Sequence, residues 1–430
     1  MITIDKLDKY ISNHIEGRKP PVEYLQKYRA RVGADFFKLR ISNDDARKVI
    51  QNALVFVVDR PNYYFLRVSI SFKKRGFKTI LLTRWGTEEY QKMFFDHIVL
   101  YDKFSDLKLL KNCVNCKFYV QSWIGWNFLP VYVSLITNQN IVCNIHDLSN
   151  VLFDDNEKLM MLPGWSKRDI DIDLKCEDYI LRKFPLVTSM YNSNAFKTFD
   201  SDIQKRFGKN ILFFPCHPSP HFFDLETRKF SEPLNLVYMG GIPSDDKPDA
   251  VFFGGKMRNV LDDLLAQPFR VTIFNNPQLT TTDNQNEINI KYQHLTKSSY
   301  ESSRFTFEKG YPPWELKSYA KEFHYGLLVA YSEKVEFSNS HIEYSMPTKL
   351  FTYLELGLPV IVIDTYKYCC EFVKTHDIGI IVSQVQMKNL YQIIIDNEER
   401  YEIMVSNIIK YISKKNMDTM IDELMYFLFI

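Results

Sequence analysis

Glycine is scarce in this sequence, with 15 residues among 430. Neither a G-x-G-x-x-G pattern nor a G-x-x-x-x-G-K-[ST] pattern occurs anywhere in the chain. These glycine-rich loops bring backbone N–H groups against the phosphates of dinucleotides and of nucleoside triphosphates, respectively. Their absence excludes the common dinucleotide-dependent enzymes and the P-loop NTPases in their usual form.

An excess of one charge is also lacking. The 54 Lys and Arg residues against 52 Asp and Glu residues leave a net charge of +2, whereas nucleic-acid-binding domains are strongly basic. We therefore expect no nucleic acid as a partner. No apolar run reaches the ~18 residues that cross a bilayer, and the charged start MITIDKLDKY lacks the apolar core of a signal peptide. The expected location is cytoplasmic.

Patterns that hold metal ions are missing as well. Cys113 and Cys116 form one C-x-x-C pair, without a second pair at the spacing of a zinc site. The pair precedes a predicted strand, so we expect reduced, packed thiols rather than a redox motif. Asp171 and Asp173 have the spacing of a D-x-D motif, but they stand at a predicted helix start, where N-capping is the better interpretation.

What the chain does contain is typical of a globular protein with two domains. Hydrophobic residues make up 46% and charged residues 25%, and domains usually hold ~100–200 residues. Short apolar runs, each followed by a helical or polar segment, predict strands at 53–58, 78–82, 97–101, 117–121, 140–145, 186–189, 234–239, 269–274, 325–330, 358–363 and 378–382. Such runs predict parallel strands that are buried on both faces. Residues 275–290 are polar and predict a loop.

The same pattern predicts the domain organisation. A proline cluster at 215–220 predicts a linker between two doubly wound α/β halves. We expect a helical N-terminal extension (1–50), a first Rossmann-like domain (51–218), a second one (219–412), and a C-terminal helix (413–430) that packs back on the first domain. Two domains of this kind predict a cleft between them that binds a small ligand.

The segment 345–361, SMPTKLFTYLELGLPVI, carries the most chemical information. Pro347 and Thr348 open a predicted helix, whose N-terminus carries a partial positive charge and binds anions. Lys349 falls in the first turn, where the helix dipole disfavours a cation unless both share an anion. Gly357 ends the helix before a buried strand. A diphosphate is the predicted ligand; the alternative is a surface lysine on an ordinary helix–strand unit.

This segment resembles the P-x-K-…-Y-L-x-x-G-x-P-V-I stretch of GT-B-fold glycosyltransferases, especially the large group-one family that uses nucleotide-sugar donors. The resemblance runs from about residue 53 onward and includes further stretches in the family's order. These stretches are His146–Asp147, Glu177–Arg182, Leu236–Gly240 with Lys247, Phe307–Gly310 and Tyr325–Ala330. The resemblance implies two Rossmann-like domains that face a cleft, the first for the acceptor and the second for the donor.

The resemblance also implies roles for individual residues. Lys247 and Lys349 would neutralise the diphosphate, so that no metal and no cofactor is expected. The implied donor-binding residues are Gly240, Gly241, Lys247, Glu343, Pro347, Thr348 and Lys349. His146 and Asp147 are the implied catalytic pair: either takes the acceptor's proton in an inverting reaction, whereas His146 holds the donor sugar in a retaining one. The alternative for this pair is a loop histidine and a capping aspartate.

Trp123 and Trp165 are the candidates for stacking on an acceptor ring, with core packing as the alternative. The apolar and basic loop 160–168 predicts a peripheral contact with the inner face of a membrane or with a lipid-linked acceptor. The implied function is transfer of a sugar from a nucleotide-sugar to a glycan, lipid-linked or protein-linked acceptor, in surface polysaccharide or glycoconjugate synthesis.

The sequence departs from the family's pattern at several places, and one of them concerns a pair of glutamates. Many members carry two glutamates eight positions apart, whereas Tyr344 and Thr352 stand at those places here and Glu343 is one residue out of register. The stereochemical outcome therefore stays open. So do two alternatives to transfer: an inactive GT-B-fold binding or scaffold protein, and a sugar-nucleotide epimerase.

Overall fold

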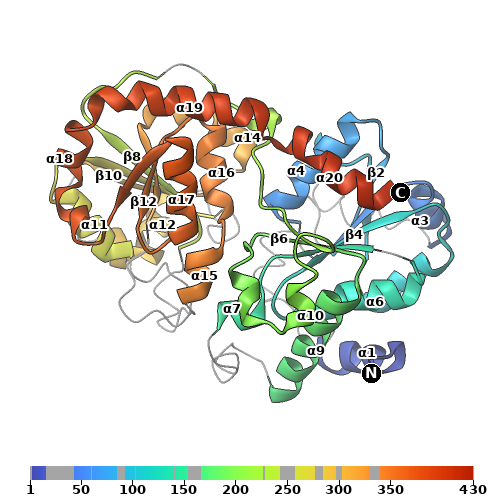
Figure 1. Cartoon of the computed structure of the whole chain (residues 1–430). Helices are drawn as coiled ribbons and strands as arrows, with labels where there is room; N and C mark the ends of the chain where they lie inside the picture. Colours follow the sequence, from blue (N-terminus) through green and yellow to red (C-terminus); the bar gives the residue numbers. More distant parts are fainter. Residues whose placement is uncertain are drawn as a thin grey trace. The chain divides into compact units, whose positions relative to one another are not determined.

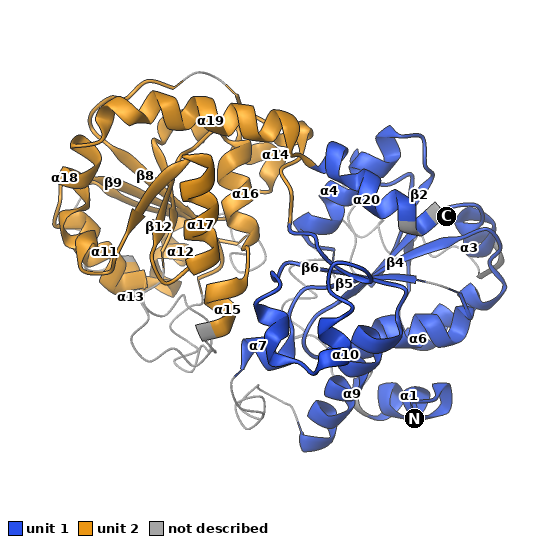
Figure 2. Ribbon diagram, viewed as in Figure 1, with its two compact units in different colours: residues 1–215, 417–430 blue, residues 216–416 orange. Residues whose placement is uncertain are grey.

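The computed structural model describes residues 2–15, 43–59, 61–84, 93–101, 103–139, 141–153, 166–225, 228–242, 257–276, 284–296, 303–329 and 339–429. The chain divides into two compact units, which are residues 1–215 with 417–430 and residues 216–416 (Figure 2). Each unit is a parallel sheet flanked by helices (Figure 1). The predicted α/β architecture of two doubly wound, Rossmann-like domains is confirmed.

The sheet of the first unit has seven parallel strands in the order β3-β2-β1-β4-β5-β6-β7. Its strands are β1 (Leu54–Val58), β2 (Thr79–Thr83), β3 (His97–Leu100), β4 (Lys117–Ser122), β5 (Ile141–Ile145), β6 (Leu186–Ser189) and β7 (Ile211–Phe213). Every residue of β1 and β5 is buried, because helices cover both faces of the sheet. The order in which the strands are added reverses between β1 and β4. Ligands of doubly wound sheets bind at such a point, beyond the carboxyl ends of the strands.

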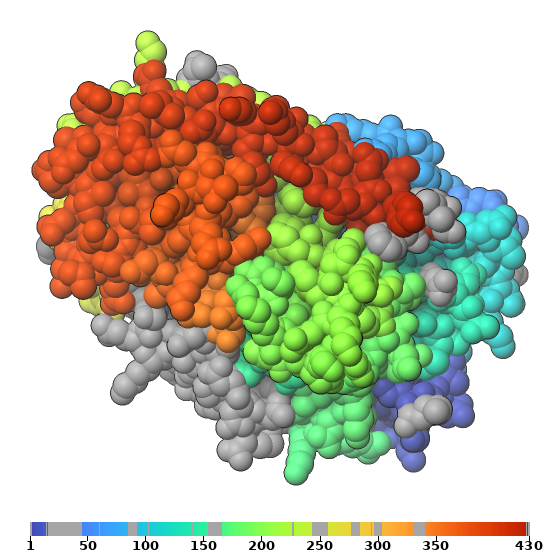
Figure 3. All heavy atoms as spheres, viewed as in Figure 1, coloured from blue at the N-terminus to red at the C-terminus, as the bar shows by residue number. Residues whose placement is uncertain are grey.

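The helices of the first unit are α1 (Ile4–Tyr10), a π-helical turn (Ile11–Ile15), α3 (Asn43–Ile50), α4 (Tyr63–Lys74), η3 (Phe104–Asn112), α6 (Phe128–Thr137), α7 (Ser149–Leu152), α9 (Lys167–Lys183), η4 (Ala195–Thr198), α10 (Ser201–Gln204) and α20 (Met417–Phe429). α20 packs on α4 (Figures 1 and 3), where Asp418 accepts hydrogen bonds from Ser71 Oγ at 2.5 Å and Lys74 Nζ at 2.8 Å. These contacts join the end of the chain to the first unit.

α9 begins earlier than the sequence predicted. Ser166 is its N-cap: the Ser166 hydroxyl accepts from the Asp169 N–H, and the Asp169 carboxylate accepts from the Ser166 N–H at 2.8 Å. This reciprocal pair is a capping box. The predicted N-cap role of Asp171 and Asp173 is therefore wrong, because both residues lie inside the helix.

The second unit has six parallel strands in the order β10-β9-β8-β11-β12-β13. They are β8 (Asn235–Met239), β9 (Arg270–Phe274), β10 (Phe305–Glu308), β11 (Tyr325–Leu328), β12 (Val360–Ile363) and β13 (Gly379–Val382). The edge strand β10 was not predicted. The loop expected at 275–290 is wrong in its second half, because Asn284 caps α12 (Gln285–Lys291).

The other helices of the second unit are η5 (Pro220–Phe222), α11 (Met257–Leu265), α13 (Gln293–Thr296), α14 (Pro313–Leu316), η7 (Ala320–Glu322), α15 (Asn339–Tyr344), α16 (Thr348–Glu355), α17 (Lys367–His376), η8 (Gln386–Asn389), α18 (Leu390–Ile395), η9 (Glu398–Arg400) and α19 (Tyr401–Lys414). In the described part of the chain, no helix combines the length and apolarity needed to cross a membrane.

Candidate functional site

The candidate donor site is built around the start of α16. Pro347 is the N-cap, with the extended backbone (φ −69°, ψ 142°) that leads into a helix, and its side chain cannot cap. Among the residues that the structure describes, no acceptor contacts the amide N–H of Thr348 or Lys349. The helix ends at Gly357, whose φ of +66° favours glycine. The predicted helix and its glycine stop are confirmed.

Lys349 is half-buried at this helix start and meets a tyrosine of the neighbouring strand. Its Nζ donates to the Tyr238 hydroxyl at 2.8 Å and lies 4.4 Å from the centre of the Tyr238 ring. Tyr238 is 4% exposed. In the described part of the chain, no carboxylate forms an ion pair with Lys349. A cation beside free helix N–H groups, without a carboxylate, attracts an anion.

Gly240 supplies the space in which Lys349 and Tyr238 meet. A Cβ at this position would lie 3.2 Å from the Tyr238 hydroxyl and 3.3 Å from Lys349 Nζ, closer than ordinary contact. The structure thus brings together two residues that the sequence predicted separately, Gly240 and Lys349. Gly241 is exposed and follows directly. Lys247, the second predicted cation, lies outside the described residues.

Tyr353, one turn after Lys349, fixes α16 on the sheet. Its hydroxyl donates to the Leu327 carbonyl at 2.9 Å and accepts from the Met239 N–H at 3.0 Å. Its ring lies over Gly326, where a Cβ would approach the ring to 2.3 Å. The helix is therefore attached to the ends of both β8 and β11. This attachment determines where Lys349 and the open N–H groups lie.

Glu343 occupies a different setting from the one expected. It lies in helix α15, and its carboxylate forms an ion pair with Lys367 at the start of α17. Thr352, at one of the places where many group-one enzymes carry glutamate, is buried, and its hydroxyl donates to the Thr348 carbonyl at 3.4 Å. Glu343 is thus already neutralised by a lysine.

In the first unit, His146 and Asp147 directly follow β5. The His146 N–H donates to the Ser122 carbonyl at the end of β4 at 2.8 Å, and both side chains are partly exposed. The N-cap of α7 is Leu148, so the alternative reading of Asp147 as a capping residue is wrong. Among the described residues, neither side chain forms a hydrogen bond or an ion pair. Both remain available to a substrate.

The turn after β4 carries Trp123, one of the two tryptophan candidates, together with Trp126. Trp123 is partly exposed and meets Trp126 edge to face, with ring centres 6.3 Å apart. Trp126 packs against Phe104 and Phe128. Trp126 therefore packs on core residues, whereas part of the Trp123 ring stays exposed at the carboxyl edge of the sheet. Trp165 lies outside the described residues.

The roles of three residues at these sites were missed from the sequence. In the sequence, Tyr238 looks like one more apolar residue of a buried strand, although its hydroxyl accepts a hydrogen bond from Lys349. Asp173 and Glu177 are buried carboxylates on α9. They fall on the same helical stripe as Ile170 and Ile180, and an acid on an apolar stripe is the signal that would have found them.

Comparisons with known proteins bear on both units. Residues 271–423 match the family model described as the glucosyltransferase 3-like C-terminal domain. Among solved structures, HepE of Anabaena in complex with UDP is 12% identical and matches 87% of this chain and 99% of its own, with a TM-score of 0.55. Sucrose-phosphate synthase of Thermosynechococcus elongatus is 11% identical over 88% of this chain and 99% of its own, with a TM-score of 0.58.

An α,α-trehalose-phosphate synthase (UDP-forming) of Burkholderia vietnamiensis is 10% identical over 87% of this chain and 99% of its own, with a TM-score of 0.51. A search of curated proteins found no match. At such identities the solved structures establish the fold, which is GT-B. The glucosyltransferase domain and this fold together identify a glycosyltransferase, as the sequence predicted.

Proposed function

We propose that the protein transfers a sugar, most simply glucose, from a uridine diphosphate sugar to a glycan, lipid-linked or protein-linked acceptor in the synthesis of a surface polysaccharide or glycoconjugate. The observation that carries this proposal is the open start of α16, where Lys349 lies beside two amide N–H groups without an acidic partner among the described residues. Negative charge grows on the diphosphate as the glycosidic bond breaks. Donors that are already in place stabilise that charge.

The nucleotide and the sugar are inferred from the comparisons. One GT-B neighbour is described in complex with UDP and another as UDP-forming, which supports uridine diphosphate as the leaving group. The matched domain is described as glucosyltransferase 3-like, which supports glucose. In this proposal the positive charge comes from Lys349 and the helix dipole, so the reaction needs no metal ion.

On the acceptor side, the proposal assigns the chemistry to the loop after β5. If the reaction inverts the anomeric centre, the Asp147 carboxylate or the His146 imidazole takes the proton of the attacking hydroxyl. If it retains the configuration, His146 holds the donor sugar. Both side chains are partly exposed and free of partners among the described residues, as either role requires.

Binding of UDP to the full chain is the first expected result. A ligand bound by the native state alone stabilises it by about 2.7 kcal/mol at a hundred times its Kd. UDP and UDP-glucose should therefore raise the midpoint of thermal unfolding, and uridine, which lacks the diphosphate, should not. Differential scanning fluorimetry with a panel of nucleotides measures this. No response to any nucleotide would contradict the proposal and favour a scaffold protein. Donor turnover without an acceptor, giving an epimeric sugar nucleotide, would favour the epimerase.

A groove in the first unit supports the peripheral membrane contact. α1 and α9 lie side by side (Figure 1) and border a cavity of about 860 Å³ with an apolar floor that includes Leu7, Ile172 and Leu174. Six Lys or Arg side chains and two carboxylates line it. A basic rim around an apolar floor fits an anionic lipid surface. The 160–165 part of the predicted membrane loop lies outside the described residues, and Lys167 and Arg168 belong to α9.

Removing the rim charges is expected to weaken binding to anionic vesicles. Lys9, Lys175 and Lys183 are exposed and form no ion pair in the described part of the chain. Each basic residue near an anionic surface contributes about 1 kcal/mol, so the triple change to glutamine should lower the vesicle partition coefficient about a hundredfold. Co-sedimentation with phosphatidylglycerol vesicles measures this.

The matched control changes three exposed lysines of the second unit, Lys317, Lys374 and Lys388, to glutamine. It lowers the net charge equally and should leave the partition coefficient close to that of the unmodified protein. Equal losses in both triple variants would show that overall charge, rather than the groove, attracts the vesicles. No binding by the unmodified protein would remove the membrane contact.

A further inference from the structure

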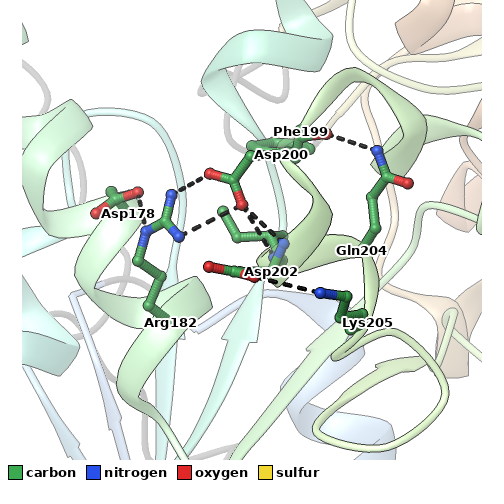
Figure 4. A network of polar contacts seen from close by, with 8 residues as sticks. Asp178, Arg182, Phe199, Asp200, Asp202, Gln204 and Lys205 are labelled. Atoms are coloured by element: carbon green, nitrogen blue, oxygen red, sulfur yellow. Dashed lines mark hydrogen bonds and ion pairs between the residues drawn. The ribbon is translucent and has the colours of Figure 1, made fainter.

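Helix α9 turns two carboxylates into the interior of the first unit. Asp173 is 3% exposed and Glu177 is 2% exposed, and they stand one turn apart on the helix. The other side of α9 is exposed to solvent. There Arg182 donates hydrogen bonds to Asp178 on the same helix and to Asp200, the N-cap residue of α10 (Figure 4). Buried carboxylates are costly unless they make hydrogen bonds, so the partners of the inner pair define what it does.

Asp173 holds the turn that follows β4. Its Oδ2 accepts from the Gly125 N–H at 3.0 Å and from Asn127 Nδ2 at 2.9 Å, and its Oδ1 accepts from the Asn127 N–H at 3.1 Å. Gly125 has a φ of +86°, which favours glycine at this turn. Asn127 Oδ1 in turn accepts from the Ser122 hydroxyl. One carboxylate thus fixes the turn that carries Trp123.

Glu177 does the same for the loop that follows β5. Its Oε2 accepts from both the N–H and the hydroxyl of Ser149, each at 2.8 Å. These contacts cap α7, whose start lies directly after His146 and Asp147. The His146 N–H also donates to the Ser122 carbonyl, which links the two loops to each other. Both loops therefore take their positions from α9.

We infer that Asp173 and Glu177 are positioning residues of the acceptor side: together they hold the Trp123 turn and the His146–Asp147 loop in the arrangement that transfer needs. The inference rests on the proposed function, since these loops are its acceptor side. The geometry carries it, because β4 and β5 are neighbours in a parallel sheet and their carboxyl ends meet at one edge.

The ionisation state of the pair adds a pH dependence. Burial raises the pKa of Asp173 to about 7 against the opposing effect of its three N–H donors, and it raises the pKa of Glu177 to about 7, helped by the nearby Asp173 and Asp147. Among the described residues, Cys176 lies near Asp173 and Tyr191 lies near Glu177, and both stay neutral because burial raises the pKa of each. A proton on Asp173 removes its negative charge and so weakens the hydrogen bonds that its oxygens accept from Gly125 and Asn127.

The stability of the folded state and the order of the Trp123 turn consequently change in opposite directions with pH. Because the folded pKa lies above the unfolded value of about 4, the native state binds more protons, and stability falls as pH rises from about 4 to 7. The hydrogen bonds to Asp173 strengthen over the upper part of this range. Order in the Trp123 turn is therefore gained near neutrality while overall stability declines, which a merely stabilising role does not produce.

The test is fluorine NMR of the full chain labelled with 5-fluorotryptophan, with the signals assigned by Trp123→Phe and Trp126→Phe. We expect the signals of Trp123 and Trp126 to titrate with a midpoint about pH 7, near the pKa values above. Asp173→Asn should abolish this titration, and Asp178→Asn, which removes an exposed carboxylate of the same helix, should preserve it. A titration of these signals that survives Asp173→Asn would overturn the inference.

Two further measurements separate this inference from the proposed function. UDP affinity of Glu177→Gln, measured by calorimetry, should stay within about twofold of wild type, because UDP is proposed to bind residues 216–416 and a factor of two is under 0.5 kcal/mol. Hydrolysis of UDP-glucose to UDP and glucose, with water as the acceptor, should slow about tenfold in the same variant. Unchanged hydrolysis, or a parallel loss of UDP affinity, contradicts positioning. If wild type binds no UDP, the proposed function fails, and the titration still decides the role of Asp173.

Discussion

Replacing Lys349 with alanine is expected to lower kcat/KM for sugar transfer about a hundredfold or more. Lys349 Nζ is the only side-chain cation that the described residues place beside the open N–H groups of Thr348 and Lys349. Its charge would stabilise the departing diphosphate, and the half-buried position of Lys349 reduces screening of that charge by water. The loss should appear mainly in kcat, because charge on the leaving group is larger in the transition state than in the bound donor.

The same substitution should leave the fold intact. It removes one hydrogen bond to the Tyr238 hydroxyl, which contributes about 1 kcal/mol. It also removes a cation from the positive end of α16, which offsets part of this loss. The thermal midpoint should therefore move by only a few degrees. Tyr238→Phe is the matched control: it keeps the ring under Lys349 and deletes the hydroxyl, so transfer should fall far less. Wild-type turnover in Lys349→Ala would remove the proposed donor site.

The strands of both sheets were predictable because burial on both faces leaves a continuous apolar run. β1 and β12 are such runs, buried at every residue. β10 was not predicted because it is an edge strand of four residues, and only one of these residues is fully buried. α12 was mistaken for a loop for a similar reason: Ile288 is its single buried residue, and the rest of the segment is polar.

The candidate site was predictable where its signal is local in sequence. The start of α16 follows from a proline, a lysine in the first turn and a glycine stop, all within one segment. The contact of Lys349 with Tyr238 joins residues 111 positions apart, and only the pairing of β8 with β11 brings them together. The roles of Asp173 and Glu177 depend on where α9 begins. The Ser166–Asp169 capping box would have placed that start, and both acids would then have fallen on the apolar stripe.

Gly326→Ala should strongly destabilise the second unit. The added Cβ would lie 2.3 Å from Cγ and 2.4 Å from Cδ1 of the Tyr353 ring, well inside van der Waals contact. Neither group can yield, because Gly326 pairs with both neighbouring strands and the Tyr353 hydroxyl is held by Leu327 and Met239. We expect the free energy of unfolding of this unit to fall by about 3 kcal/mol.

Trp314 is the only tryptophan among residues 216–416, so a 5-fluorotryptophan signal at that position reports urea unfolding of this unit. The steric cause predicts strong coupling to Tyr353. In a Tyr353→Leu background the ring is gone, and adding Gly326→Ala should cost less than about 1 kcal/mol, which leaves a coupling of about 2 kcal/mol. Additive losses would instead mean that the alanine acts through the strand backbone.

The ring that excludes a side chain at Gly326 also anchors α16. Gly326→Ala should therefore weaken UDP binding even at urea concentrations where the unit is still folded, whereas a second-unit glycine change without contact to α16 should not.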